Sequence, residues 1–363
     1  MFLAIVVFIL ILGLLIFVHE LGHFILAKRA GIKVEEFGFG FPPRIFGIRK
    51  GETLYSLNLF PLGGFVRIYG EVRKGGKDPL RKRAFYSQSA LVRAGILIAG
   101  VTMNVILAAL LLGLGHWIGL PALIDDSQTN NLDNVKVQIL QVAFNSPAEQ
   151  AKLKIGDTIS ELRYEDEIIS VSTVSQVQGF IDSYRGDEVT LIIQRGDQIL
   201  EKQIVPREDH PKQEGPLGIS LARTAIVSYP WYEAIARGFI STFVLTWAIL
   251  VAFSGILWQL MTSGHLAVGI AGPIGIFDLT NQATQLGFIY VLQFTAILSI
   301  NLAIINILPI PALDGGRLLF LAIEKIKGSP ISQKIERVSH LIGFILLILL
   351  MIAITWRDIV RMF

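Results

Sequence analysis

The sequence contains no cysteine and comparatively little charge. Of its 363 residues, 17% are charged and 52% are hydrophobic. The absence of cysteine excludes disulfide bonds and thiolate metal sites, so any transition metal must be held by histidine and carboxylate side chains. The net charge of +3 is small and the basic residues form short clusters beside apolar runs, which argues against nucleic acid as a partner. This composition is typical of an integral membrane protein with two or three domains.

Long apolar runs occur at five places. Four approach spanning length, at 2–25, 92–120, 234–260 and 288–310, and a fifth covers 341–354. No basic residue precedes the first run and no small-residue cleavage site follows it, so we expect it to be retained rather than removed as a signal peptide. Lys28, Arg29 and Lys33 follow the run, and the positive-inside rule therefore places its C-terminal end in the cytoplasm.

The stretch between the first two runs differs from both. It reads KVEEFGFGFPPRIFGIRKGETLYSLNLFPLGGFVRIYGE. Its Gly and Pro residues and the alternation in TLYSLNLF predict short strands and hairpins rather than helix. We expect a β-element that lies against or dips into the membrane, where protein or water satisfies its backbone groups. Gly63 and Gly64 in FPLGGFV fit either an access gate or a plain tight turn.

The composition of residues 125–220 is that of a soluble α+β domain. VKVQILQVAF predicts a strand, and NSPAEQAKL predicts a helix with Ser146 as N-cap, Pro147 at the first position and Glu149 closing a capping box. EVTLIIQRGDQILEKQIV predicts a hairpin, and PLGISL one more short strand. SPAEQAKLKIGDTI and the final LGI strand resemble a PDZ domain of the permuted bacterial type. That resemblance implies a groove for an extended peptide or a size filter built on the same surface, with an ordinary small insert as the alternative.

A cluster of ionisable residues interrupts the first apolar run in FVHELGHFILAKR. His19 and His23 are four residues apart, so on a helix they share one face and both imidazoles can reach one ion. Glu20 is adjacent and can address a water on that ion. HExxH occurs by chance in long sequences, but idle ionisable groups at membrane depth are costly. This context favours a functional metal site.

A candidate for the third ligand follows the run 288–310, in NLAIINILPIPALDGGRLLF. A catalytic zinc needs three protein ligands and an open fourth position. Asp314 stands after Pro309 and Pro311 and before a glycine pair. Alternatively, Asp314 is the N-cap of the next helix, and the two roles are compatible.

The paired motifs HExxH and NILPIPALDG resemble the signature of the site-2 protease family of intramembrane zinc metalloproteases. The order of elements, with FGFG and PLGGFV after the first run and a PDZ-like insert after the second, is similar to that of the regulator of sigma-E protease group. The resemblance covers essentially the whole chain. It implies that Zn²⁺ is held by His19, His23 and Asp314 and that Glu20 is the catalytic general base.

The resemblance also implies substrate contacts. Asn306 and Pro309 in NILPIPALDG would touch the substrate backbone near the scissile bond. The strand in ETLYSLNLF, with Tyr55, Leu57 and Asn58, is expected to offer an edge to which an unwound substrate pairs. In the second run the family often shows GPxxN, whereas this chain reads GVTMN, so Asn104 keeps its place and the proline is missing.

The three ligands of one ion must sit at one depth, which constrains the topology. If 234–260 crossed the membrane, Asp314 would arrive on the wrong side, so we predict that this run is an extracytoplasmic interfacial helix despite its hydropathy. The predicted fold is an α-helical multi-pass membrane protein of about four spans, with a membrane-associated β-element and an inserted PDZ-like domain. The predicted divisions are 1–31, 32–90, 91–120, 125–222, 223–285 and 286–363.

The predicted function is that of an intramembrane zinc endopeptidase in a bacterial inner membrane. Its partners would be the lipid bilayer and single-span membrane proteins already trimmed by a first protease, such as an anti-sigma factor or signal peptide remnants. The active site would lie towards the cytoplasmic side and the PDZ-like domain in the periplasm. One alternative is a PDZ-containing receptor or scaffold with a structural zinc site, although such a site has no use for Glu20. A metal transporter is a third possibility, but it needs a continuous polar path that these runs lack.

Overall fold

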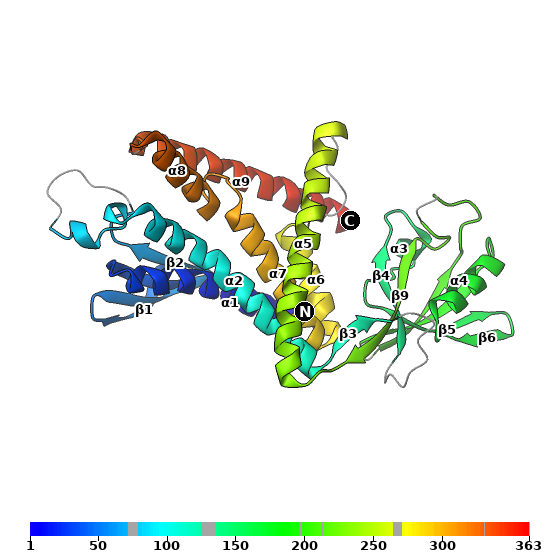
Figure 1. Cartoon of the computed structure of the whole chain (residues 1–363). Coiled ribbons are helices and arrows are strands. Elements are labelled where there is room, and N and C mark those ends of the chain that lie inside the picture. The colour runs from blue at the N-terminus through cyan, green and yellow to red at the C-terminus, as the bar shows by residue number, and fades with distance from the viewer. Residues whose placement is uncertain are drawn as a thin grey trace. The chain divides into compact units, whose positions relative to one another are not determined.

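The computed structural model describes residues 1–71, 79–124, 135–196, 198–211, 214–263, 271–329 and 331–362. These residues form two compact units. The first unit comprises Met1–Leu112, Ala236–Gln282 and Leu292–Phe363, and the second comprises Gly113–Ile235 and Ala283–Val291. Long helices and a curled β-hairpin make up most of the first unit, and an antiparallel sheet makes up most of the second (Figure 1).

All five apolar runs are helical. They form α1 (Phe2–Arg29), α2 (Ala90–Ile118), α5 (Trp231–Ser263), α7 (Phe288–Ile307) and α9 (Gln333–Met362), with α6 (Pro273–Leu286) and α8 (Asp314–Lys327) among them. Each of the five is long and apolar enough to cross a membrane. In α5 and α9 only 6% of the most apolar stretch is buried within the protein, which suits helices that face lipid. The chain is therefore a membrane protein, while the four-span topology stays a prediction.

The β-element consists of β1 (Val34–Lys50) and β2 (Thr53–Ile68). The prediction of short strands was wrong, because both strands are long and are bent by repeated register shifts. Because both strands bend, β1 and β2 pair in three separate segments. The pairs of segments are 36–39 with 64–67, 36–39 with 54–57, and 44–50 with 53–58. Residues 54–57, the middle of TLYSLNLF, are thus flanked on both sides, whereas residues 64–67 pair on one side among the described residues.

A small apolar core joins the end of α1 to the open end of the hairpin and the start of α2. Its buried members are Ala27, Ile32, Val34, Ile68, Phe85, Ile96 and Leu97. Burial of each valine, leucine, isoleucine or phenylalanine side chain in this core contributes about 1.5 to 3 kcal/mol to the free energy of unfolding. This core fixes the hairpin against the helix that carries HExxH.

The second unit is built on a seven-stranded antiparallel sheet. Its strands are β3 (Leu120–Leu123), β4 (Lys136–Val142), β5 (Thr158–Tyr164), β6 (Glu167–Ser170), β7 (Val189–Arg195), β8 (Gln198–Ile204) and β9 (Ile219–Val227). The order is β3-β9-β4-β5-β7-β8, with β6 paired to β5. The helix α4 (Val174–Ser183) begins with a capping box of Thr173 and Gln176 and buries Val177, Phe180 and Ile181 in the core.

The sequence predictions for this unit are confirmed in part. The β7–β8 hairpin is confirmed, although Asp197 in its turn lies outside the described residues. NSPAEQAKL forms only the single turn α3 (Pro147–Gln150); Ser146 caps it, and the Glu149 carboxylate accepts from the Asn145 N–H instead of closing a box. The last strand is longer than PLGISL, because β9 pairs with both β4 and β3. The sheet therefore extends beyond both ends of the predicted 125–222 segment.

Candidate metal centre

Helix α1 carries His19, Glu20 and His23 towards its C-terminal end. Both histidines are buried, each with 8% of its surface exposed. The neighbouring helix α2 comes close because two positions are glycine. A Cβ on Gly22 would lie 2.4 Å from the Ala99 carbonyl oxygen, and one on Gly100 would lie 2.5 Å from His23 Nε2. The two imidazoles thus pack directly on the backbone of α2.

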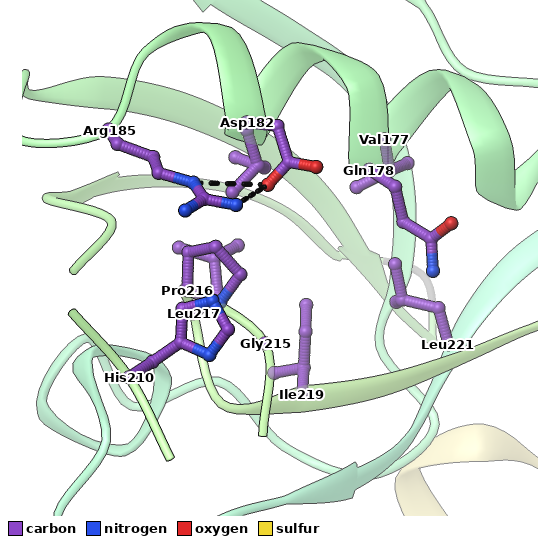
Figure 2. A pocket seen from close by; sticks show the side chains of 11 residues that line it. Val177, Gln178, Asp182, Arg185, His210, Gly215, Pro216, Leu217, Ile219 and Leu221 are labelled. Atoms are coloured by element: carbon purple, nitrogen blue, oxygen red, sulfur yellow. Dashed lines mark hydrogen bonds and ion pairs between the residues drawn. The ribbon is translucent and has the colours of Figure 1, made fainter. Parts of the chain in front are cut away.

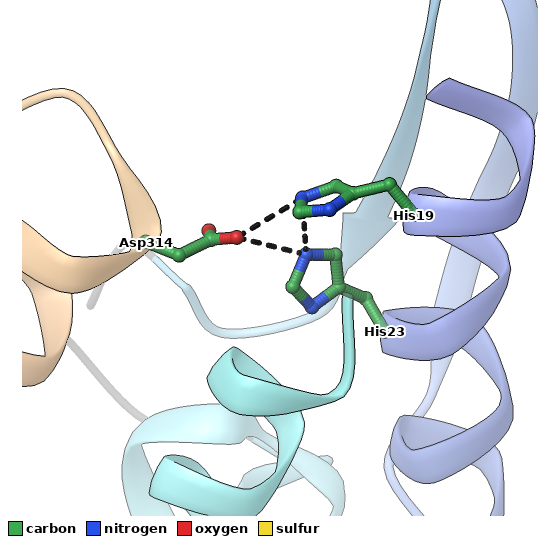
Figure 3. A group of neighbouring side chains, drawn as sticks. All are labelled: His19, His23 and Asp314. Carbon is green, nitrogen blue, oxygen red and sulfur yellow. Dashed lines mark hydrogen bonds and ion pairs between the residues drawn. The ribbon is translucent and has the colours of Figure 1, made fainter. Parts of the chain in front are cut away.

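Asp314 lies at the start of α8. The prediction that it is the N-cap was wrong, because Leu313 is the N-cap and Asp314 is the first helical residue. Leu313 has no side chain that could cap the helix. The Asp314 carboxylate therefore remains directed at the two histidines of α1 (Figure 3).

The side-chain atoms of these three residues form a nearly equilateral triangle. His19 Nε2 lies 3.2 Å from His23 Nε2, and Asp314 Oδ2 lies 3.1 Å from the first and 3.2 Å from the second. A tetrahedral zinc with ligand distances of about 2.0–2.2 Å separates its ligands by about 3.3–3.6 Å. The observed spacing is close to that of three corners of such a tetrahedron.

The protonation of His23 also fits a metal site. Its Nδ1 lies 2.7 Å from the Ile96 carbonyl oxygen, which can only accept, so Nδ1 carries a proton and Nε2 is the ring nitrogen left to bind a metal. Asp314 Oδ2 is buried and makes no hydrogen bond of normal geometry to any described residue. A carboxylate oxygen this close to two imidazole nitrogens needs a proton or a metal ion between them. The residues fit zinc, and the absence of cysteine leaves an N/O ligand set.

Glu20 lies beside the triangle and faces a cavity of about 250 Å³. The cavity is lined by Ile16, His19, Glu20, Leu302, Asn306, Ala312, Leu313 and Asp314. It has room for water and for part of a peptide backbone next to the carboxylate. Asn306 therefore shares the cavity with Glu20, whereas Pro309 is exposed and lies outside its lining.

The hairpin reaches Glu20 through residues 64–66. The Val66 N–H donates to the Glu20 carboxylate, and a Cβ on Gly64 would lie 3.5 Å from Glu20 Cγ. Both glycines of FPLGGFV are in extended backbone, so the tight-turn interpretation was wrong. Because the Val66 N–H points to Glu20, it points away from β1, and the outer edge of β2 lies beside Glu20.

The three hairpin residues predicted to meet substrate lie elsewhere. Tyr55 and Leu57 are 36% and 46% exposed, whereas Asn58 is buried and its Nδ2 donates to the Gly40 carbonyl oxygen at 2.9 Å. The prediction that ETLYSLNLF offers a free edge was wrong at residues 54–57, because the backbone there pairs on both sides. The double pairing joins segments distant in sequence, which a strand pattern does not reveal.

The loop between α7 and α8 is held by α9. Ala312 has a φ of +86°, which a residue with a side chain rarely adopts, and its N–H donates to His340 Nδ1 at 2.8 Å. A Cβ on Gly343 would lie 2.2 Å from the Pro311 carbonyl oxygen, so α9 also touches the loop through its backbone. No motif in the sequence marks this contact between His340 and the loop.

The site combines HExxH on one apolar helix, a carboxylate from a distant helix and a cavity beside the glutamate. This combination is that of a membrane-embedded metalloprotease. The profile of peptidase family M50 matches residues 7–350. Zinc metalloprotease RasP of Oceanobacillus iheyensis is 32% identical over 442 aligned positions, covering 99% of each chain. Regulator of sigma-W protease RasP of Bacillus subtilis is 32% identical over 443 positions, again covering 99% of each.

The chain thus belongs to peptidase family M50, the site-2 protease family, and is a zinc metalloprotease of the membrane. Its cofactor is Zn²⁺. Full-length similarity to proteases leaves no support for the alternatives of a receptor with a structural zinc site or a metal transporter.

Proposed function

We propose that the chain cleaves transmembrane segments of single-span membrane proteins, with zinc held by His19, His23 and Asp314 and with Glu20 as general base. The observation that carries the proposal is the triangle of ligand atoms, 3.1 to 3.2 Å on each side, next to the cavity that Glu20 faces. Two of the ligands come from α1 and one from α8, so the proposed reaction takes place between helices of this protein.

Each side chain has a separate task in this mechanism. When bound, zinc polarises the scissile carbonyl and lowers the pKa of water towards about 7. Glu20 accepts a proton from the attacking water and passes it to the leaving amine. The Val66 N–H holds the Glu20 carboxylate in place, and Asn306 binds a backbone group of the unwound substrate across the cavity.

A substrate helix must unwind before attack, because its peptide bonds are otherwise shielded in i to i−4 hydrogen bonds. We propose that the opened segment pairs with the outer edge of residues 64–66, in place of the interior strand at Tyr55, Leu57 and Asn58. This edge lies beside Glu20, which takes the Val66 N–H, and residues 64–67 have a strand partner on one side only among the described residues. Pro309, exposed in the following loop, would meet the substrate outside the cavity.

The proposed orientation has four spans, with the metal centre towards the cytoplasm and α5 outside the membrane core. It rests on the need for both histidines and Asp314 to share one depth, and on the basic residues Lys28, Arg29, Lys325 and Lys327 lying at the ends of α1 and α8. The cysteine-free chain permits a direct test. Single cysteines at Ser228 and Thr262, near the two ends of α5, should both react with an impermeant thiol reagent from outside. Labelling from opposite sides would show that α5 crosses.

We propose that the seven-stranded sheet and α4 form the PDZ-like domain. Between α4 and β9 lies a groove of about 280 Å³, whose apolar floor includes Ile181, Ile219 and Leu221 and whose end carries the ion pair of Arg185 and Asp182 (Figure 2). Residues 219–222 of β9 pair with β4, while β3 pairs only from Thr224 onwards. Among the described residues this leaves 219–222 with an edge beside the groove for an extended peptide, and a size filter on the same surface is the competing outcome.

The substrates we propose are membrane-anchored regulators, such as an anti-sigma factor, and signal peptide remnants, after a first protease has removed most of the external part. Cleavage of a tagged single-span substrate should be measured for the wild type, Glu20→Gln and Asp314→Asn, with zinc content determined on each purified protein. Glu20→Gln should keep zinc and lose cleavage, and Asp314→Asn should lose much of both. Unchanged processing in both variants would refute the assignment.

A further inference from the structure

The side chain of Asn104 is enclosed between three helices of the first unit. Asn104 and Ser299 are both fully buried. The Ser299 hydroxyl on α7 donates to the Asn104 backbone carbonyl at 2.8 Å, and the Asn104 amide lies 3.3 Å from Nδ1 of His19 on α1. The amide therefore contacts the ring nitrogen of His19 that faces away from the ligand triangle.

The two histidines differ in how their tautomers are set. At His23 the Ile96 carbonyl leaves one tautomer for the neutral ring that binds a metal, with the proton on Nδ1 and a lone pair on Nε2. At His19 the neighbour is an amide, which can donate through Nδ2 or accept through Oδ1. The two ends of an amide are nearly identical in shape, so only the bonding network distinguishes them. The tautomer of His19 depends on which end faces it.

In the structure Nδ2 faces His19, so Nδ1 of His19 accepts and its proton lies on Nε2, inside the ligand triangle. That tautomer cannot bind a metal through Nε2. With the amide turned by 180°, Oδ1 accepts a proton from Nδ1 and Nε2 presents its lone pair to the metal. Before this turn, Oδ1 is buried without a hydrogen-bond partner among the described residues. Turning the amide satisfies this oxygen.

We infer that Asn104 is the positioning residue of His19: its Oδ1 accepts the Nδ1 proton in the zinc-loaded enzyme and thereby directs Nε2 to the metal. This inference rests on the proposed metal site. Outer partners of this kind orient metal-binding histidines and typically change metal affinity by about 10- to 100-fold when removed. In either orientation one end of the Asn104 amide faces His19 and the other end has no partner among the described residues. The two orientations therefore differ little by themselves, and metal binding to Nε2 of His19 would favour the one in which Oδ1 accepts.

The test measures zinc affinity of the detergent-solubilised full chain by competition with a chelator. Asn104→Leu, similar in size but unable to accept, should weaken zinc binding about 10- to 100-fold. Asn104→Asp keeps an acceptor and should bind zinc at least as tightly as the wild type. Thr102→Val is the matched control on α2, since among the described residues the Thr102 hydroxyl bonds only to its own helix at Ile98, and it should leave affinity unchanged. Nitrogen chemical shifts of ¹⁵N-labelled histidine report whether His19 carries its proton on Nδ1.

The outcomes separate this inference from the proposed function. If His19→Ala loses zinc but Asn104→Leu binds it like the wild type, Asn104 does not position His19 and the metal site still stands. If His19→Ala binds zinc fully, the proposed site itself is wrong. Should Asn104→Leu fail to fold, Asn104→Asp decides: weaker zinc binding in that variant overturns the inference, and wild-type affinity with the proton on Nδ1 upholds it.

Discussion

Replacing Gly100 with alanine tests whether the close approach of α2 shapes the metal centre. The added Cβ would lie 2.5 Å from His23 Nε2 and 2.7 Å from His19 Cε1. Unstrained heavy-atom contacts are about 3.5 Å or longer, so the rings or the helix must move by about 1 Å. Metal sites tolerate changes of only about 0.2 Å in ligand distance. Overpacking of this kind costs about 1–3 kcal/mol.

If that cost falls on the zinc-loaded state, Gly100→Ala weakens zinc binding about 5- to 150-fold, since about 1.4 kcal/mol corresponds to a factor of ten. The assay is zinc affinity by chelator competition, with cleavage measured at saturating zinc. Gly95→Ala is the control on the same helix, because a Cβ there meets no atom within 4 Å. Wild-type zinc affinity in Gly100→Ala, together with an unchanged melting temperature, would refute the reasoning.

Three further predictions concern the structure around the site. His340→Leu removes the acceptor of the Ala312 N–H and should lower cleavage about tenfold, whereas His340→Gln should recover most of it; equal cleavage by both variants would contradict this role. The Arg83 guanidinium and then the Lys28 ammonium hold the pKa of Glu52 at about 2, against 4.5 for the ordinary group, so the pairing stabilises the fold above pH 4.5 and this contribution is lost as the pH falls towards 2. Because these groups are partly exposed, the effect is about 1 kcal/mol, and the melting temperatures of wild type and Glu52→Gln should converge between pH 4.5 and 2; a constant gap would disprove it. Arg195→Met leaves the buried Asp157 carboxylate without its guanidinium and should destabilise the sheet by about 3–5 kcal/mol by hydrogen exchange, whereas a loss below about 1 kcal/mol would mean that the Lys154 N–H suffices.

Local patterns were sufficient for the elements that depend on local physics. The five apolar runs are helices, and the four-residue spacing of His19 and His23 places both rings on one face of α1. Asp314 was reached through the resemblance of NILPIPALDG to a known signature, because 291 residues separate it from His23 and no spacing rule connects them.

Contacts between distant segments could not be read from the sequence. The doubled pairing of β1 and β2 depends on where the strands bend, and it removes the edge predicted at TLYSLNLF. The contact of His340 with Ala312 depends on how α9 packs against a loop with an unusual backbone. Asn104 stood out in GVTMN, but its place beside His19 follows from the glycines that bring α2 against α1.

The distance along the chain between the proposed zinc ligands also orders events during synthesis. His19 and His23 emerge from the ribosome among the first residues, and Asp314 emerges only after most of the chain has been made. Until then α1 holds two of the three ligands, and the cavity lacks the wall formed by Leu302, Asn306 and Leu313. A nascent copy therefore lacks the complete set of proposed ligands until Asp314 has been made, and we expect its proteolytic activity to begin only after that.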